Sequence, residues 1–298
     1  KITAMCGDGA NDCGALKQAD AGLSLSEAEA SISSPFTSKT PNISSMIDLI
    51  RECRAGLATN FSLFNIMALY SLIQYTSTVI TQYFYGYPAD LQYLYWDVAC
   101  NFFFFLTIGY TGSAETLSTL RPSDSLFSLS NVICVLVMFI IQLVGQLSVI
   151  IVMANGTFAS ILDYINNAGE DVNLAAYLVD NEFVQTTYEV QSIFMFSNFM
   201  YVFSVMAFSI SRPWKKFFFT NWPFMIVLVL VFAYNFLICL YPPARLEIFF
   251  VQEFDMRWQG LMCGMGCAFG VFMYIVQKLC LENMFNWLRE KYPEKQWL

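Results

Sequence analysis

Long apolar runs are the feature of this sequence that most limits its possible folds. Several of them reach the roughly 20 residues that a helix needs to cross a bilayer. Only 13% of the 298 residues are charged, whereas about a quarter are charged in a typical soluble domain. We therefore predict a multi-pass, all-α membrane domain from Ala58 to Leu279. Its six predicted transmembrane helices cover residues 58–85, 91–110, 126–154, 189–210, 222–240 and 258–279.

The distribution of Lys and Arg predicts which side of the membrane each segment faces. Of the 15 basic residues, all except Arg245 and Arg257 fall on one side of the six predicted spans. By the positive-inside rule that side is the cytosol, which places both ends of the chain there. The opposite side is rich in Asp and Glu, either to attract cations or because excluding Lys and Arg leaves acids behind. Asn155 lies on that side in an Asn-Gly-Thr sequence and is a candidate glycosylation site.

A short segment before the first span carries residues suited to metal and phosphate chemistry. Residues 7–12 are Gly-Asp-Gly-Ala-Asn-Asp, between a partly apolar stretch and a helix-forming one. The pattern predicts a strand, a tight loop, a helix and a second strand. Asp8 is a hard oxygen ligand for Mg²⁺, Asp12 is a second carboxylate, and Asn11 is a donor to a phosphoryl oxygen at the helix N-terminus. Taken singly, each part is also compatible with plain turn and capping chemistry.

The same residues resemble a known family. Gly-Asp-Gly-Ala-Asn-Asp, followed by Cys-Gly-Ala-Leu-Lys-Gln-Ala-Asp, is similar to the hinge motif that closes the phosphorylation domain of P-type ATPases, in the haloacid-dehalogenase superfamily. Ser-Leu-Ser-Glu-Ala-Glu-Ala-Ser-Ile-Ser-Ser-Pro-Phe at 24–36 and Met-Ala-Leu-Tyr-Ser-Leu-Ile-Gln at 67–74 resemble type V, group B, the polyamine-transporting ATPases. Further matches are Tyr188-Glu189 with Phe194 and Phe196, and Thr-Asn-Trp-Pro-Phe at 220–224.

The resemblance implies an ATP-driven transporter with Mg²⁺ as its cofactor. The aspartate that ATP phosphorylates would lie in an N-terminal part that this chain lacks, together with most of the ATP-binding residues, so this fragment alone should be inactive. The group implies a cationic small-molecule substrate such as a polyamine, and an endosomal, lysosomal or vacuolar membrane. Residues 1–41 would end the phosphorylation domain, 42–57 would form a stalk, 58–279 would be the fifth to tenth transmembrane helices, and 280–298 would be a cytosolic tail.

One long helix is predicted to join the soluble and membrane parts. Ile43, Ile47, Ile50 and Arg54 fall at helical spacing, and the pattern predicts continuous helix over residues 44–84. Such a helix would carry movement of the phosphorylation domain to the membrane, or it is an ordinary amphipathic linker.

Polar residues inside the predicted spans are candidates for a substrate pathway, because burying them in a bilayer is costly. Asp90 and Asp97 share one helix face, and Asn101 follows one turn later. Tyr70 and Gln74 form a polar stripe on the preceding helix, and the resemblance implies that these two helices line the pathway. Carboxylates would neutralise ammonium groups while aromatic faces hold them. Alternatively, Asp97 caps its helix end, Asp90 is a loop acid, and Tyr70 and Gln74 bind helices together.

Other functions remain compatible with the sequence. The pump could move a metal cation or a lipid, because the group-specific residues lie mostly near the hinge. The chain could also be a non-catalytic membrane partner with a vestigial motif.

Two pairs of small residues at four-residue spacing, Gly260 with Gly264 and Gly266 with Gly270, predict close helix packing. We expect a lipid bilayer around the chain and no nucleic acid partner.

Overall fold

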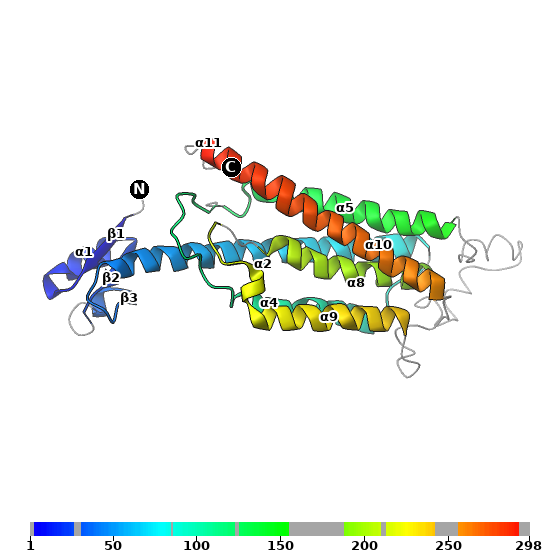
Figure 1. Ribbon diagram of the computed structural model, residues 1–298, viewed down its shortest axis with the longest axis horizontal. Coiled ribbons are helices and arrows are strands. Elements are labelled where there is room, and N and C mark those ends of the chain that lie inside the picture. The colour runs from blue at the N-terminus through cyan, green and yellow to red at the C-terminus, as the bar shows by residue number, and fades with distance from the viewer. Residues whose placement is uncertain are drawn as a thin grey trace, which may run out of the picture.

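The computed structural model describes residues 3–26, 31–84, 86–122, 125–154, 188–209, 213–241 and 256–291. Figure 1 shows a small sheet at one end, a long helix leading away from it, and a helical bundle around the far part of that helix. The candidate glycosylation site Asn155 lies outside the described residues, as do most acidic residues predicted on the non-cytosolic side.

The soluble piece is a three-stranded parallel sheet with one covering helix. The strands lie in the order β1 (Ala4–Gly7), β2 (Ala21–Ser24) and β3 (Phe36–Thr37). A 3-10 turn (Ala10–Asp12) and helix α1 (Cys13–Gln18) connect β1 to β2. Helix α1 packs against β2, and Leu16 on α1 and Leu23 on β2 are both buried. The predicted order of strand, loop, helix and strand is therefore confirmed.

The third strand lies in residues 33–42, where two prolines and many Ser and Thr residues predict a loop, so that prediction is wrong for β3. A 3-10 turn at Ser31–Ser33 precedes β3, which pairs with β2 through Leu23 and Ser24. The Ser34 hydroxyl donates to the backbone oxygens of Gly22 and Phe36, so one side chain fixes the segment to the sheet. The local sequence pattern did not indicate this strand pairing, because prolines and hydroxyl residues are typical of loops.

Helix α2 (Ser44–Tyr83) joins the sheet to the bundle as one continuous helix of 40 residues. At 1.5 Å per residue it is about 60 Å long, twice the hydrocarbon thickness of a bilayer. The prediction of a helix over residues 44–84 is confirmed. Figure 1 shows its first turns beside the sheet and its last turns among the other membrane helices.

Helix α8 (Tyr188–Phe208) forms the centre of the bundle. It is buried on nearly every side, and its neighbours are α2, α5 (Leu129–Ala154), α9 (Trp222–Leu240), α10 (Met256–Ile275) and the π-helical segment η3 (Tyr95–Phe102). Gly266 and Gly270 of α10 face Phe199 and Phe203 of α8, and a Cβ on Gly266 would lie 3.0 Å from Phe199. Gly260 and Gly264 have nothing within 4 Å of such a Cβ, so the prediction of close packing fails for that pair among the described residues.

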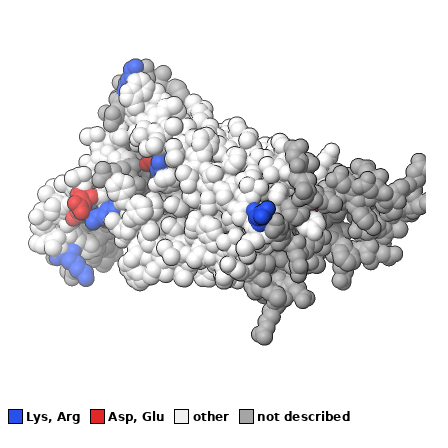
Figure 2. Space-filling view, turned by 45° about the vertical axis from the view of Figure 1, so that its right-hand side comes forward, with Lys and Arg blue, Asp and Glu red and all other residues white. Residues whose placement is uncertain are grey.

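Five helices in the described part of the chain are long and apolar enough to cross a membrane, where six were predicted. They are α2, α5, α8, α9 and the helix Met256–Leu288, which comprises α10, the π-helical segment η6 (Val276–Leu281) and most of α11 (Glu282–Lys291). On the face shown in Figure 2, a broad uncharged band separates the charged residues at the sheet end from the blue patch at the other end. This distribution suits a bundle in a bilayer.

The region predicted as the second span is helical but not a regular α-helix. It begins as α3 (Asp90–Leu94), widens into η3 and continues as α4 (Phe103–Ile108). Within η3 the side-chain amide of Asn101 donates to the backbone oxygen of Trp96 at 2.7 Å. This contact occupies a carbonyl that a regular helix would use, which is one way to stabilise a wider turn. Hydropathy alone does not register such a change.

Candidate functional site

The loop after β1 brings Asp8, Asn11 and Asp12 together at the carboxyl end of the sheet. The carboxylate of Asp12 accepts the backbone N–H of Asp8 at 3.3 Å and that of Gly9 at 3.5 Å, so it folds back over the loop. A Cβ on Gly7 would lie 2.7 Å from Asp12, which explains the glycine at that position. Asp8 is exposed at the tip of the loop.

The donor set of this loop fits Mg²⁺. Mg²⁺ is usually held by one or two carboxylates and keeps waters and phosphate oxygens as its other ligands. Asp8 and Asp12 supply two carboxylates within one turn, and the described residues contain no group of three or more His, Cys, Asp or Glu that could hold a metal. Two carboxylates are a number of protein ligands that Mg²⁺ commonly has when water and phosphate oxygens complete its coordination.

In the membrane part, Asp97 meets side chains of the neighbouring helix. The hydroxyl of Tyr70 donates to Asp97 Oδ1, and Gln74 Nε2 donates to the same oxygen at 3.4 Å. One level further along, Thr78 and Tyr93 share a hydrogen bond of 2.6 Å. Asp97 itself is exposed in this chain, on the open side of η3. The two predicted polar stripes thus face each other at Asp97.

The other two predicted pathway residues have different surroundings. Asp90 is exposed in the first turn of α3 and no described contact joins it to Asp97. Asn101 is 1% exposed and uses its amide to hold the Trp96 carbonyl. Asn101 therefore contributes to the shape of η3. Asp90 lies at the start of α3, apart from the contacts of Asp97.

Buried amides on α8 and α9 hold η3 from behind. Trp96 Nε1 donates to Asn198 Oδ1 at 2.7 Å, and the hydroxyl of Tyr95 donates to Asn235 Oδ1. Asn235 Nδ2 in turn donates to the backbone oxygen of Asn198 at 3.1 Å. Sequence reasoning missed both asparagines, although a polar residue inside an apolar span is the signal that would have identified them.

Two loop segments, together called the collar, contact α2 where it enters the bundle. They are residues 109–122 and 213–221, and they pair with each other through Ser113 and Lys215. From α2, Arg51 donates to the Glu115 backbone oxygen at 2.9 Å, Arg54 donates to that of Ser118, and Glu52 accepts the Ser113 hydroxyl at 2.5 Å. These contacts bind the first loop to the stalk part of α2, and the second loop is paired with the first.

Lys215 is a buried cation in this collar. Its side chain is 2% exposed, and its ammonium group donates to Thr59 Oγ1 at 2.7 Å and to the Ile108 backbone oxygen at 3.5 Å. Burial disfavours the charged form and lowers the pKa of Lys215 from 10.5 to about 8. Lys216 lies next to it and forms an exposed ion pair with Glu115 at 3.3 Å.

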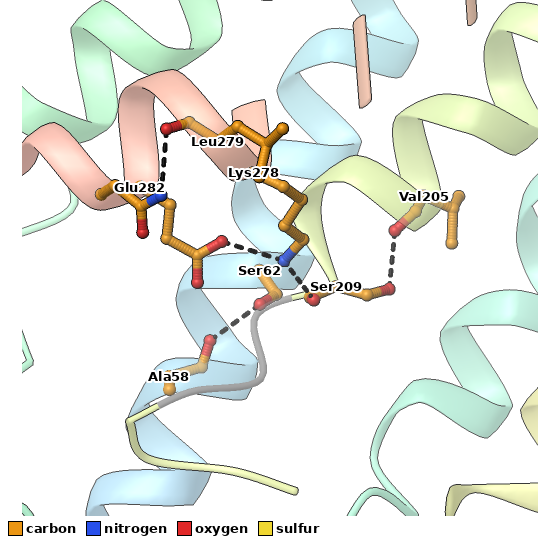
Figure 3. A network of polar contacts seen from close by, with 8 residues as sticks. Ala58, Ser62, Val205, Ser209, Lys278, Leu279 and Glu282 are labelled. Atoms are coloured by element: carbon orange, nitrogen blue, oxygen red, sulfur yellow. Dashed lines mark hydrogen bonds and ion pairs between the residues drawn. The ribbon is translucent and has the colours of Figure 1, made fainter. Parts of the chain in front are cut away.

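A second junction joins the end of α8 to η6 and the start of α11 (Figure 3). Lys278 donates to the Ser209 backbone oxygen at 2.8 Å and forms an ion pair with Glu282 at 3.1 Å. The backbone oxygens at the end of a helix lack intrahelical partners, so a lysine there is favourable. Ser62 of α2 lies close by in the same view, with its hydroxyl donating to the Ala58 backbone oxygen.

The chain is similar to transport ATPases over most of its length, although no family model matches it. It is 36% identical over 252 residues to Polyamine-transporting ATPase 13A3 from Homo sapiens, which covers 82% of this chain and 20% of that protein. It is 35% identical over 305 residues to Polyamine-transporting ATPase 13A2 from Mus musculus, covering 98% and 24%. It is 35% identical over 243 residues to Probable cation-transporting ATPase 13A4 from Gallus gallus, covering 76% and 20%.

This chain belongs to the type V P-type ATPases. The resemblance inferred from the hinge motif is therefore confirmed. The chain spans between a fifth and a quarter of the length of these relatives. The matched proteins are named as transporting ATPases, and the described part of this chain contains helices long and apolar enough to cross a membrane.

Proposed function

We propose that this chain is the C-terminal part of a magnesium-dependent P-type ATPase that moves polyamines across an organelle membrane. Two of the similar proteins are named as polyamine transporters. The observation that carries the proposal is the meeting of Asp97 with Tyr70 and Gln74, in which an exposed carboxylate of a membrane helix lies beside hydrogen-bonding and aromatic groups. An endosomal, lysosomal or vacuolar membrane, with both chain ends in the cytosol, belongs to the same proposal.

The hinge loop has the chemistry for the phosphorylation half of the cycle. Asp8 and Asp12 would hold Mg²⁺, which would screen the negative charge of the phosphoryl oxygens. Asn11 would donate to one of those oxygens. The aspartate that receives phosphate is not in this sequence, so the hinge loop supports the chemistry and does not perform the transfer by itself.

Asp97 would receive an ammonium group of the substrate. An ammonium group has N–H donors, and a carboxylate is the strongest acceptor for them. The ring of Tyr70 offers an aromatic face next to the same carboxylate, and such faces bind cations and cover methylene stems. Asp90, at the start of α3, would help to draw the polycation toward this position.

Helix α2 would link the two sites. It is continuous from the sheet to Tyr70 and Gln74, and its Arg51, Glu52 and Arg54 hold the first collar loop. A movement of the phosphorylation domain would then reach Asp97 through one rigid element and the loops bound to it. Physical continuity supports this coupling, and a functional measurement has to establish it.

The test uses the full-length pump in lipid. ATP hydrolysis should increase with spermine or spermidine, and Asp97→Asn should abolish this increase. Asp20→Asn is the control, because Asp20 is an exposed acid beside the sheet whose carboxylate accepts hydrogen bonds from Thr3, away from the membrane helices. Tagged protein should locate to acidic organelles.

The cation transporter named among the similar proteins makes another cation the second candidate substrate. Stimulation by a metal cation or a lipid, without stimulation by polyamines, would contradict the polyamine proposal. A full-length pump with no ATPase activity under any of these conditions would instead favour a non-catalytic partner.

A further inference from the structure

Tyr201 on α8 has a polar group with no partner. Its side chain is fully buried, and its hydroxyl has no hydrogen-bond partner among the described residues. Other buried hydroxyls on this helix are paired: Ser192 accepts Trp258 Nε1 at 3.0 Å, and Ser204 donates to the Tyr201 backbone oxygen at 2.7 Å. An unpaired buried hydroxyl is unfavourable and needs an explanation.

The surroundings of Tyr201 connect it to Asp97. Its ring centroid lies 5.6 Å from that of Tyr70 and 5.6 Å from that of Trp96. Tyr70 donates to Asp97, and Trp96 precedes it in η3. The ring that carries the unpaired hydroxyl is therefore packed against the ring of the residue that donates to Asp97.

A cationic substrate would disturb that hydrogen bond. Tyr70 has a single hydroxyl proton, which it donates to Asp97 in this structure. An ammonium group that binds Asp97 brings its own N–H donors and competes for the same oxygen, which Gln74 also contacts. Asp97 is exposed and Tyr70 is half-buried, so both can change partners without opening the core. The displaced Tyr70 hydroxyl then needs another acceptor.

We propose that Tyr201 is this acceptor: the Tyr70 hydroxyl donates to Asp97 without substrate and to Tyr201 when an ammonium group occupies Asp97. The Tyr70 proton stays on its oxygen throughout, so only hydrogen bonds change. Tyr201 is thus a positioning residue that stabilises the substrate-bound arrangement. The inference rests on the proposed function, because it takes a substrate with N–H donors as the group that displaces Tyr70.

A double-mutant cycle in the full-length pump tests the exchange. Tyr201→Phe removes only the hydroxyl and should raise the spermine concentration for half-maximal ATPase activity about fivefold, or about 1 kcal/mol. The effect on the maximal rate should be smaller. In a Tyr70→Phe background, which has no hydroxyl to relocate, Tyr201→Phe should cause no further shift. Tyr75→Phe, an exposed tyrosine on α2, should leave the half-maximal concentration unchanged.

Three results would overturn the proposal, and they are distinguishable. An unchanged half-maximal concentration in Tyr201→Phe means that the hydroxyl has no part in binding. An equal shift in both backgrounds means that Tyr201 acts on substrate or packing without Tyr70. A wild-type pump that does not respond to spermine removes the proposed function, and the exchange with it. Thermal unfolding of each variant checks that the bundle remains folded.

Discussion

The ammonium group of Lys215 lies 2.7 Å from the hydroxyl oxygen of Thr59, which connects a loop between α8 and α9 to the middle of α2. No carboxylate oxygen of the described residues lies within ion-pair distance of this cation. A buried charge without a counter-ion is costly, yet the contact joins two segments that are 156 residues apart. The position where α2 enters the bundle is therefore sensitive to protonation.

The stability of the pump should increase with pH because of Lys215. Its pKa is about 8 in the folded state, below the ordinary value of 10.5, so the unfolded state binds more protons between these values. Stability rises with pH wherever the unfolded state holds more protons, and the gain between pH 7 and pH 9 is about 1 kcal/mol. Thermal unfolding midpoints of the wild type, measured between pH 7 and pH 9, should rise more than those of Lys215→Met. Parallel pH profiles for the two proteins would contradict this prediction.

Gly270→Ala should destabilise the bundle. A Cβ at this position would overlap the ring of Phe203 on α8, and overpacking of a tight contact costs about 1–3 kcal/mol. Gly264→Ala is the matched control, since a Cβ there has nothing within 4 Å and alanine favours helix by about 0.5–1 kcal/mol. Denaturation of both purified variants compares them directly. Equal stability of the two variants would show that α8 and α10 are less closely packed.

Asn198→Leu should weaken the support of η3. The substitution removes the acceptor of the buried Trp96 indole N–H, and an unpaired buried donor costs about 1–3 kcal/mol. We expect a lower unfolding temperature together with a higher half-maximal substrate concentration, because Asp97 follows Trp96 directly. Asn283→Leu is the control, as Asn283 is exposed and bonds only within its own helix. A stability loss without any change in substrate dependence would limit Asn198 to a packing role.

Asp8→Asn should raise the magnesium requirement. Loss of a carboxylate ligand weakens binding of a hard cation, and we expect at least about a tenfold increase in the Mg²⁺ concentration for half-maximal ATP hydrolysis, about 1.4 kcal/mol. Asp20→Asn is the control in the same small domain. Its carboxylate accepts the backbone N–H and hydroxyl of Thr3, contacts that lower the pKa of Asp20. An identical Mg²⁺ dependence in both variants would remove Asp8 from the metal site.

Local patterns predicted the parts of this fold that depend on neighbouring residues in the chain. The long helix α2 and the order of strand, loop, helix and strand follow from hydrophobic spacing and glycine positions. The meeting of Asp97 with Tyr70 and Gln74 was within reach as well, because consecutive antiparallel helices place such stripes opposite each other.

Features that depend on distant residues were not predictable in this way. The π-helical turns of η3 are held by Asn198 and Asn235, which lie about 100 residues or more further along the chain. The strand β3 depends on Ser34 reaching Gly22. Which glycine pair packs depends on the phenylalanines of α8 that face it. In each case, the decisive partner belongs to an element that local sequence does not specify.

Helix α2 is uninterrupted, and Lys215 contacts it at Thr59, between the sheet end and Tyr70. From Ser44 to Thr59 the helix rises about 22 Å, and from Thr59 to Tyr70 about 16 Å, at 1.5 Å per residue. If the contact between Lys215 and Thr59 holds this point of α2 while the rigid helix tilts, a sideways displacement of the sheet end gives Tyr70 an opposite displacement that is somewhat smaller. Such a tilt would move the Tyr70 hydroxyl relative to Asp97.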